Sequence, residues 1–147
     1  IAHIGLGLLF LAVSLNSILS YEKNLNLAPG ESIFVNESIK EFSFDDIKVL
    51  KASNHDVISV EVSLLQDGKN IFLNPQKRKY ATRGQITTES SIYASILKDT
   101  YLTIGDQLEN GSWTFALKIN YFIKWIWFSA FLMVLGILIT IFKKKAT

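Results

Sequence analysis

The chain has 147 residues, of which 49% are hydrophobic, and its formal net charge is +2. Basic and acidic residues are interspersed, which argues against a nucleic-acid partner held through its phosphates. The sequence contains no cysteine, which excludes disulfides, thiolate nucleophiles and cysteine-ligated metals from this chain. All thirteen acidic residues lie between Glu22 and Glu109, so the two ends have the composition of membrane segments and the middle that of a soluble domain.

Residues 1–20 form the first apolar segment, which is long enough for a transmembrane helix. The segment contains His3, and an ionisable side chain inside such a span is costly and indicates a function. At helical spacing His3 shares a face with Gly7, Phe10, Ser14 and Ser17. The segment starts without a basic flank, so we expect an N-terminally truncated transmembrane helix. A signal peptide is the alternative, but the charged n-region is missing and Leu15-Asn16-Ser17 is a poor cleavage site.

Residues 21–120 are expected to form a small all-β domain, because short runs of β-branched and aromatic residues alternate with turn signals. About seven strands are predicted, over Ser32–Val35, Ile39–Lys51, Val57–Gln66, Asn70–Asn74, Ile92–Leu97, Tyr101–Ile104 and Trp113–Ile119. Pro29-Gly30 opens the domain, and Asp67-Gly68 and Asn110-Gly111 predict tight turns. This spacing favours a sandwich or a partly open barrel. The stretch from Thr88 to Asp99 has the alternative of a helical turn.

Residues 121–142 form the second apolar segment, with eighteen uncharged residues between Lys124 and Lys143. As a helix these cover about 27 Å, close to the thickness of the hydrocarbon core. Residues 143–147 begin with three lysines and are read as a cytoplasmic basic tail, which makes the β-domain extracytoplasmic and places His3 deep, toward the cytoplasmic half. One face of this helix has mostly small or polar residues that would permit close helix packing: Trp125, Ser129, Met133, Gly136 and Thr140.

The two histidines are the first candidates for chemistry. A neutral imidazole such as that of His3 is a good iron or zinc ligand, and one histidine from each of two helices can hold a haem iron. The alternative is a histidine that hydrogen-bonds a neighbour or reaches the membrane interface. His55 lies in a polar tetrapeptide, Ser53-Asn54-His55-Asp56, and is read as a solvated residue without catalytic partners.

A basic segment at residues 74–84 is the second candidate. It concentrates Lys77, Arg78, Lys79 and Arg83, whose side chains suit carboxylates such as haem propionates or an acidic partner surface. The alternative is a solvated strand edge whose charges discourage aggregation. The sequence has no carboxylate pair, metal-binding motif, phosphate-binding loop or catalytic triad order, so it contains no self-contained active site.

Several short motifs occur in an order that is specific as a set. They are Ala2-His3-Ile4-Gly5, Leu27-Ala28-Pro29-Gly30-Glu31, Pro75-Gln76-Lys77-Arg78-Lys79-Tyr80, Arg83-Gly84, Thr88-Glu89, Asp99-Thr100-Tyr101-Leu102, Gly105-Asp106, Gly111-Ser112-Trp113 and Lys124-Trp125-Ile126-Trp127. Over nearly the whole chain, this series closely resembles the C-terminal part of the CcmF family of cytochrome c-type biogenesis proteins.

The resemblance implies a multi-pass haem lyase subunit of the bacterial inner membrane, or of the mitochondrial one. Such a subunit takes haem from the haem chaperone CcmE and, with CcmH-type subunits, helps attach it to apocytochrome c. By the resemblance, His3 matches one of two axial ligands of a transmembrane b-type haem that keeps the substrate haem reduced. The second ligand would come from an upstream part of the same protein, so this fragment would hold no complete lyase site. The alternative function is a scaffold or interaction domain that is anchored in membrane lipid and has no cofactor.

Overall fold

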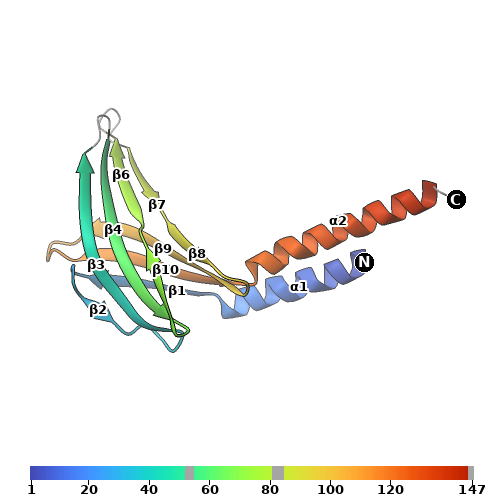
Figure 1. Cartoon of the computed structure of the whole chain (residues 1–147), viewed down its shortest axis with the longest axis horizontal. Coiled ribbons are helices and arrows are strands. Elements are labelled where there is room, and N and C mark those ends of the chain that lie inside the picture. Colours follow the sequence, from blue (N-terminus) through green and yellow to red (C-terminus); the bar gives the residue numbers. More distant parts are fainter. Residues whose placement is uncertain (52–54, 81–84, 146–147) are drawn as a thin grey trace. The chain divides into compact units, whose positions relative to one another are not determined.

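The computed structural model describes residues 1–51, 55–80 and 85–145 (Figure 1). The chain divides into two compact units. The helical unit contains residues 1–21, 94–99 and 119–147, and the sandwich unit contains residues 22–93 and 100–118.

The helical unit contains the two predicted apolar helices, α1 (Ala2–Leu19) and α2 (Ile123–Lys145). Both are long and apolar enough to cross a membrane. Ser20 caps the C-terminus of α1: its N–H donates to the Asn16 carbonyl at 2.9 Å, and its backbone is extended, with φ −60° and ψ 139°. Helix α2 runs through the lysines that were expected to follow it, so they form its last turn rather than a separate tail.

Helices α1 and α2 pack closely because small residues lie between them. A Cβ on Gly5 would lie 2.8 Å from Met133 Cγ, and a Cβ on Gly136 would lie 2.5 Å from the backbone nitrogen of Ala2. Ser129 is fully buried, and its hydroxyl donates to the Trp125 carbonyl at 2.6 Å. The predicted small-residue face of α2 therefore packs against α1, as expected for membrane helices.

The sandwich unit is built from two antiparallel sheets (Figure 1). The first has four strands in the order β1-β10-β9-β8, and the second has the order β2-β3-β4-β6-β7, with β5 also paired to β4. The strands are β1 (Tyr21–Leu27), β2 (Ser32–Ile33), β3 (Ile39–Lys51), β4 (His55–Gln66), β5 (Lys69–Leu73), β6 (Gln76–Tyr80), β7 (Ile86–Glu89), β8 (Ser91–Ala94), β9 (Lys98–Gln107) and β10 (Trp113–Tyr121). Strands β1, β8, β9 and β10 each have an end in the helical unit.

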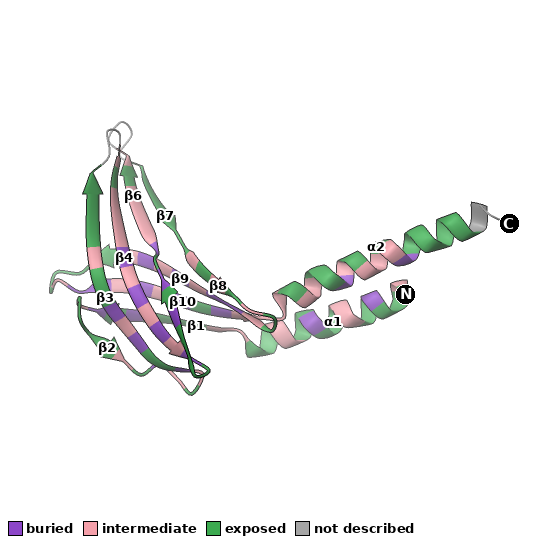
Figure 2. Cartoon of the chain, in the orientation of Figure 1, coloured by how far each residue is buried: buried purple, intermediate pink, exposed green. Residues whose placement is uncertain are grey.

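The core of the sandwich lies between these sheets, and buried residues alternate with less buried ones along much of β4 and β10 (Figure 2). The ring of Phe115 on β10 meets Phe42 and Phe44 of β3 edge to face, with centroids 5.5 and 5.0 Å apart. All three rings are at most 1% exposed. The buried hydroxyl of Thr100 donates to Gln66 Oε1 at 2.9 Å, which adds one polar link between the sheets.

Two predicted turns are present in the sandwich unit. Asp67 and Gly68 join β4 to β5 with φ values of 48° and 74°, which is the pattern of a type I′ hairpin turn. Gly111, with φ 84°, follows Asn110 in the turn between β9 and β10, where the Asn110 side chain accepts from the Ser112 N–H at 3.1 Å.

The sequence-based fold class is confirmed in the form of a sandwich, but the strand predictions were incomplete. Strands β6 and β7 and the greater part of β1 were not predicted. The alternative of a helical turn between Thr88 and Asp99 is wrong for this fold, because the segment contributes to β7, β8 and β9. Here the long-range pairing of β7 with β6 and of β8 with β9 outweighs a weak local capping signal.

Candidate functional site

His3 lies in the first turn of α1 with its side chain exposed. It lines a shallow, apolar pocket of about 210 Å³ together with Ala2, Leu6, Met133 and Ile137. One turn further along, a Cβ on Gly7 would meet no described atom within 4 Å. His3 therefore lies at the margin of the contact between α1 and α2, and Gly7 lies on the side of α1 where the described residues leave open space.

The donor set around His3 fits one axial position of a haem and no more. The described residues contain no group of three or more histidine, cysteine, aspartate or glutamate side chains that could hold a metal ion. His3 belongs to the helical unit and His55 to the sandwich unit. An exposed imidazole beside an open glycine could supply one ligand to a haem iron.

His55 differs from the solvated turn residue that the sequence indicated. It begins strand β4, pairs with Tyr80 of β6 and is half-buried. The two rings lie 5.3 Å apart with a tilt of 32°. Because the pair joins two neighbouring strands, His55 contributes to the sheet.

The basic segment is divided between the two faces of β6. Lys77 has only 13% of its side chain exposed, and its Nζ pairs with Asp106 and donates to the Gly105 carbonyl at 3.2 Å. Arg78 points to the other face, where it pairs with Glu89 at 3.0 Å. Arg83 lies outside the described residues. Lys77 and Arg78 therefore serve contacts within the sandwich, which leaves Lys79 as the exposed cation of β6.

A groove of about 270 Å³ at one end of the sandwich brings Lys77 and Lys79 together with apolar side chains. It is lined by Val49, Asp56, Ile58, Lys77, Lys79, Ile86, Asp106, Gln107 and Trp113. Val49 and Ile86 are more than half exposed, at 61% and 52%. This groove was not predicted from the sequence, because its residues come from six strands whose order was not predicted.

Strand β7 borders the groove and is the last strand of its sheet. The Tyr80 N–H donates to the Gln85 carbonyl at 2.9 Å, which fixes the pattern of hydrogen bonds between β6 and β7. In an antiparallel pair, alternate residues bond to the neighbouring strand, so Thr87 bonds to β6. The N–H and C=O groups of Ile86 and Thr88 point away from β6. All four residues of β7 are exposed. Such an edge can accept an extended peptide as an additional strand.

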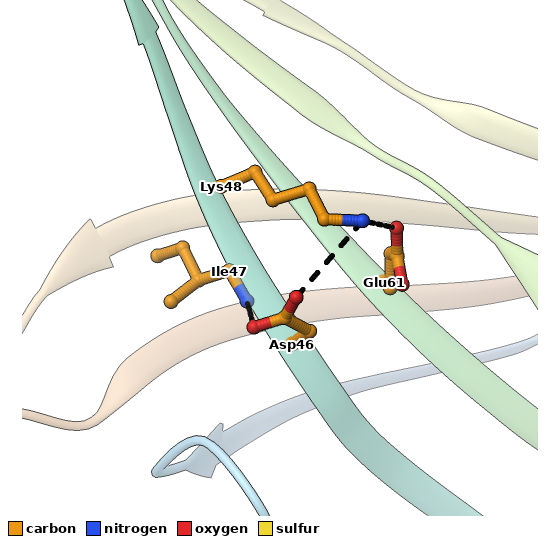
Figure 3. A network of polar contacts seen from close by, with 4 residues as sticks. All are labelled: Asp46, Ile47, Lys48 and Glu61. Atoms are coloured by element: carbon orange, nitrogen blue, oxygen red, sulfur yellow. Dashed lines mark hydrogen bonds and ion pairs between the residues drawn. The ribbon is translucent and has the colours of Figure 1, made fainter.

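A surface ion-pair network on β3 and β4 has a structural role (Figure 3). Lys48 hydrogen-bonds Glu61 on the neighbouring strand and lies 4.0 Å from Asp46. The hydrogen bond and the charge of the Glu61 carboxylate raise the pKa of the Lys48 ammonium above its usual value. The pairing register of β3 and β4 shifts between Phe44 and Asp46. The Lys48–Glu61 pair lies just after this shift and connects the two strands there.

Two helices that are long and apolar enough to cross a membrane, together with an antiparallel β-sandwich, define the class of a membrane protein that carries a folded β-domain. A family model described as the CcmF C-terminal β-sandwich matches residues 18–121, and the chain belongs to this family.

Curated relatives and a solved structure agree with this assignment. The chain is 32% identical to the cytochrome c-type biogenesis protein CcmF of Pseudomonas aeruginosa over 137 residues, which are 92% of this chain and 20% of that protein. It is 32% identical to CcmF of Escherichia coli over 145 residues, or 98% of this chain and 22% of that protein. A solved structure of the cytochrome c haem lyase CcmF shares the fold with a TM-score of 0.72 at 14% identity, over 93% of this chain and 23% of that one. The chain thus spans about a fifth of the length of these relatives.

Proposed function

We propose that this chain is the C-terminal part of a haem lyase subunit that supports haem transfer to apocytochrome c, and that His3 is one axial ligand of a b-type haem held in the membrane. The relatives named above are cytochrome c biogenesis proteins, and the solved structure is named a haem lyase. The observation that carries the proposal is the exposed imidazole of His3 in an open apolar pocket at the margin of the contact between α1 and α2.

The residues around His3 suit this role. A neutral imidazole nitrogen can bind iron, and a haem bound between two axial ligands supplies one-electron transfer, here to keep the substrate haem reduced. Leu6, Met133 and Ile137 line the pocket beside His3 with apolar side chains, which suit the apolar face of a haem. Gly7 leaves space beside the ligand that any larger residue would fill.

The absorption spectrum of the reduced, purified full-length protein tests the ligand assignment. We expect His3→Ala to abolish or shift the b-type bands and His3→Met to retain haem with a changed spectrum and a higher reduction potential. Leu19→Ala, which alters the far end of the same helix without changing a ligand, is the control and should leave the spectrum unchanged. A spectrum of His3→Ala identical to that of the native protein would contradict the assignment.

The sandwich unit is proposed to lie on the extracytoplasmic side of a bacterial inner membrane, or of a mitochondrial one. Support comes from the three lysines in the last turn of α2, which the positive-inside rule places in the cytoplasm. In a cysteine-free background, a membrane-impermeant maleimide should label Phe72→Cys in intact cells and label Lys143→Cys only after lysis. Labelling in the opposite order would overturn this topology.

The partners proposed for the sandwich are the haem chaperone CcmE, CcmH-type subunits and apocytochrome c. The groove supports a partner surface, since Lys79 lies there beside exposed apolar side chains and could contact a carboxylate, including a haem propionate. Reversal of this charge by Lys79→Glu should weaken co-purification with a partner, while Lys118→Glu, on strand β10 outside the groove, should not. Equal co-purification of both variants would count against the groove.

A second candidate function is an interaction domain without a cofactor, which the open edge of β7 favours. Thr88→Pro removes an N–H that points away from β6, so it should keep the fold and block the addition of a peptide strand. Thr87→Pro removes an N–H that bonds to β6 and should destabilise the sandwich. If Thr88→Pro has no effect on partner co-purification, this candidate fails.

A further inference from the structure

The turn between β8 and β9 belongs to the helical unit and is tightly closed. The Ser95 N–H donates to the Lys98 carbonyl at 2.9 Å, and the Ser95 hydroxyl donates to the same oxygen at 2.8 Å. The Lys98 N–H returns a bond to the Ser95 hydroxyl at 3.3 Å. These bonds hold the two residues between them, Ile96 and Leu97, in a defined conformation.

This tip presents apolar side chains that the described residues do not cover. Ile96 is 73% exposed and Leu97 is 52% exposed. Turns that face water usually consist of polar residues and glycine. Two adjacent aliphatic residues at an exposed hairpin tip are unfavourable in water, because their apolar surface stays hydrated. Their exposure therefore calls for an apolar environment.

The tip is fixed to the first turn of α2. The Phe122 N–H donates to the Leu97 carbonyl at 2.8 Å, and Ile96 lines a shallow pocket of about 280 Å³ with Lys124, Trp125 and Phe128. The apolar surface continues along the helix, where Trp127 and Phe131 are 73% and 61% exposed. The surface of the tip is thus continuous with an exposed apolar side of α2.

The side chains around the tip are those of a membrane interface. Trp125 and Trp127 stand at the start of the apolar span, the Lys98 ammonium lies 5.8 Å from the centre of the Tyr121 ring, and Lys124 is exposed beside the pocket. Tryptophan and tyrosine concentrate at the level of the lipid headgroups, and lysine complements the phosphates there.

From this geometry we infer that the Ser95–Leu97 tip is a lipid contact. Ile96 and Leu97 enter the boundary between headgroups and acyl chains, the pocket beside Trp125 holds part of a phospholipid, and Lys124 meets its phosphate. The contact gives the helical unit a third attachment to the bilayer, next to the two helices. The inference does not depend on haem binding by His3.

Site-specific fluorescence in proteoliposomes tests the contact. In the full-length protein without other cysteines, Ile96→Cys carries an environment-sensitive label, and Phe72→Cys serves as a matched control because Phe72 is 75% exposed on β5 in the sandwich unit. We expect blue-shifted emission at position 96, with at least about a tenfold preference for quenching by lipids that carry a nitroxide near the headgroup over aqueous iodide. The label at position 72 should show the reverse preference.

Two results would overturn the lipid contact. Iodide quenching at position 96 as strong as at position 72 would place the tip in water. Protection from both quenchers would show that protein, such as another helix of the full-length chain, covers the tip. Leu97→Cys provides a second reporter if the first variant does not fold. The label at position 96 should be quenched more strongly by anionic than by zwitterionic nitroxide lipids, and Lys124→Gln should reduce this preference. No reduction would remove Lys124 from the contact.

Discussion

Phenylalanine has opposite surroundings in the two units. Phe10 on α1 is 67% exposed, whereas Phe42 and Phe44 on β3 are completely buried. The sandwich unit folds in water and must bury its aromatic side chains between two sheets, since the hydrophobic effect drives their association. The helical unit exposes its large apolar residues because lipid is as apolar as they are, and its helices associate through small residues instead. The same residue type therefore contributes to the folding of one unit and to the membrane solubility of the other.

The largest expected effect is the loss of an aromatic ring from the sandwich core. Phe115→Ala should lower the free energy of unfolding by about 3–5 kcal/mol, because it leaves a cavity between Phe42 and Phe44. Phe10→Ala on α1 should change it by no more than about 0.5 kcal/mol, as is usual away from buried contacts. The free energies of unfolding of both variants, measured in the same detergent or bilayer, test this comparison. Equal losses of unfolding free energy in the two variants would contradict it.

The next effect concerns two glycines on the same helix. Gly5→Leu should weaken α1–α2 packing by about 1–3 kcal/mol, since even a Cβ would come within 2.9 Å of the Ser129 carbonyl oxygen. Gly7→Leu should leave this packing intact, because its Cβ would meet no described atom. Gly7→Leu should nevertheless disturb the haem spectrum if His3 is a ligand.

Unfolding in mixed detergent micelles and the reduced spectrum, measured on both glycine variants, separate the two roles. A Gly7→Leu protein with weakened helix packing would show that α1 has been assigned the wrong contact face.

The β4–β5 turn should show a smaller effect. Gly68→Ala places a side chain at φ 74°, and the left-handed conformation costs a non-glycine residue about 1–2 kcal/mol. Asp67→Asn should be nearly neutral, since asparagine tolerates the φ of 48° at that position. Thermal unfolding of the two variants gives the difference, and equal melting temperatures would contradict the type I′ assignment.

The smallest effect is that of the exposed Lys48–Glu61 pair. Glu61 raises the pKa of Lys48 in the folded state, so the pair stabilises the protein below the unfolded-state pKa of about 10.4 and loses this contribution as the pH rises through the higher folded-state pKa. Lys48→Met should therefore be less stable than the native protein at pH 8 and should approach it once the pH exceeds the raised folded-state pKa of Lys48. A difference in stability that persists at high pH would assign the effect to packing rather than charge.

The sequence predicted the parts of the chain whose structure depends on neighbouring residues. The helices were found because each satisfies its own backbone hydrogen bonds and is apolar throughout. Asp67-Gly68 and Asn110-Gly111 were found because turn geometry depends on two residues. His3 stood out because an imidazole is rare in an apolar span.

The missed elements depend on distant partners. Strand β6, with the sequence Gln-Lys-Arg-Lys-Tyr, has no apolar alternation, and it is a strand because β4 and β7 pair with it on either side. The basic cluster that the sequence indicated is separated by the same pairing, since neighbouring residues of a strand face opposite ways. Lys77 thereby becomes a partly buried partner of Asp106, which is 29 residues away in the sequence.

By itself, the sequence determined that two apolar helices frame a β-rich domain and that one histidine lies in the first helix, because composition and local hydrogen bonding decide these features. Only the tertiary structure decided which face of α1 packs against α2, which cations of β6 remain exposed, and where the groove and the Ile96 tip lie. Each of these features depends on contacts between residues far apart in the chain. Forming such a contact closes a long loop at an entropic cost, and the local sequence pattern does not indicate which of these contacts form.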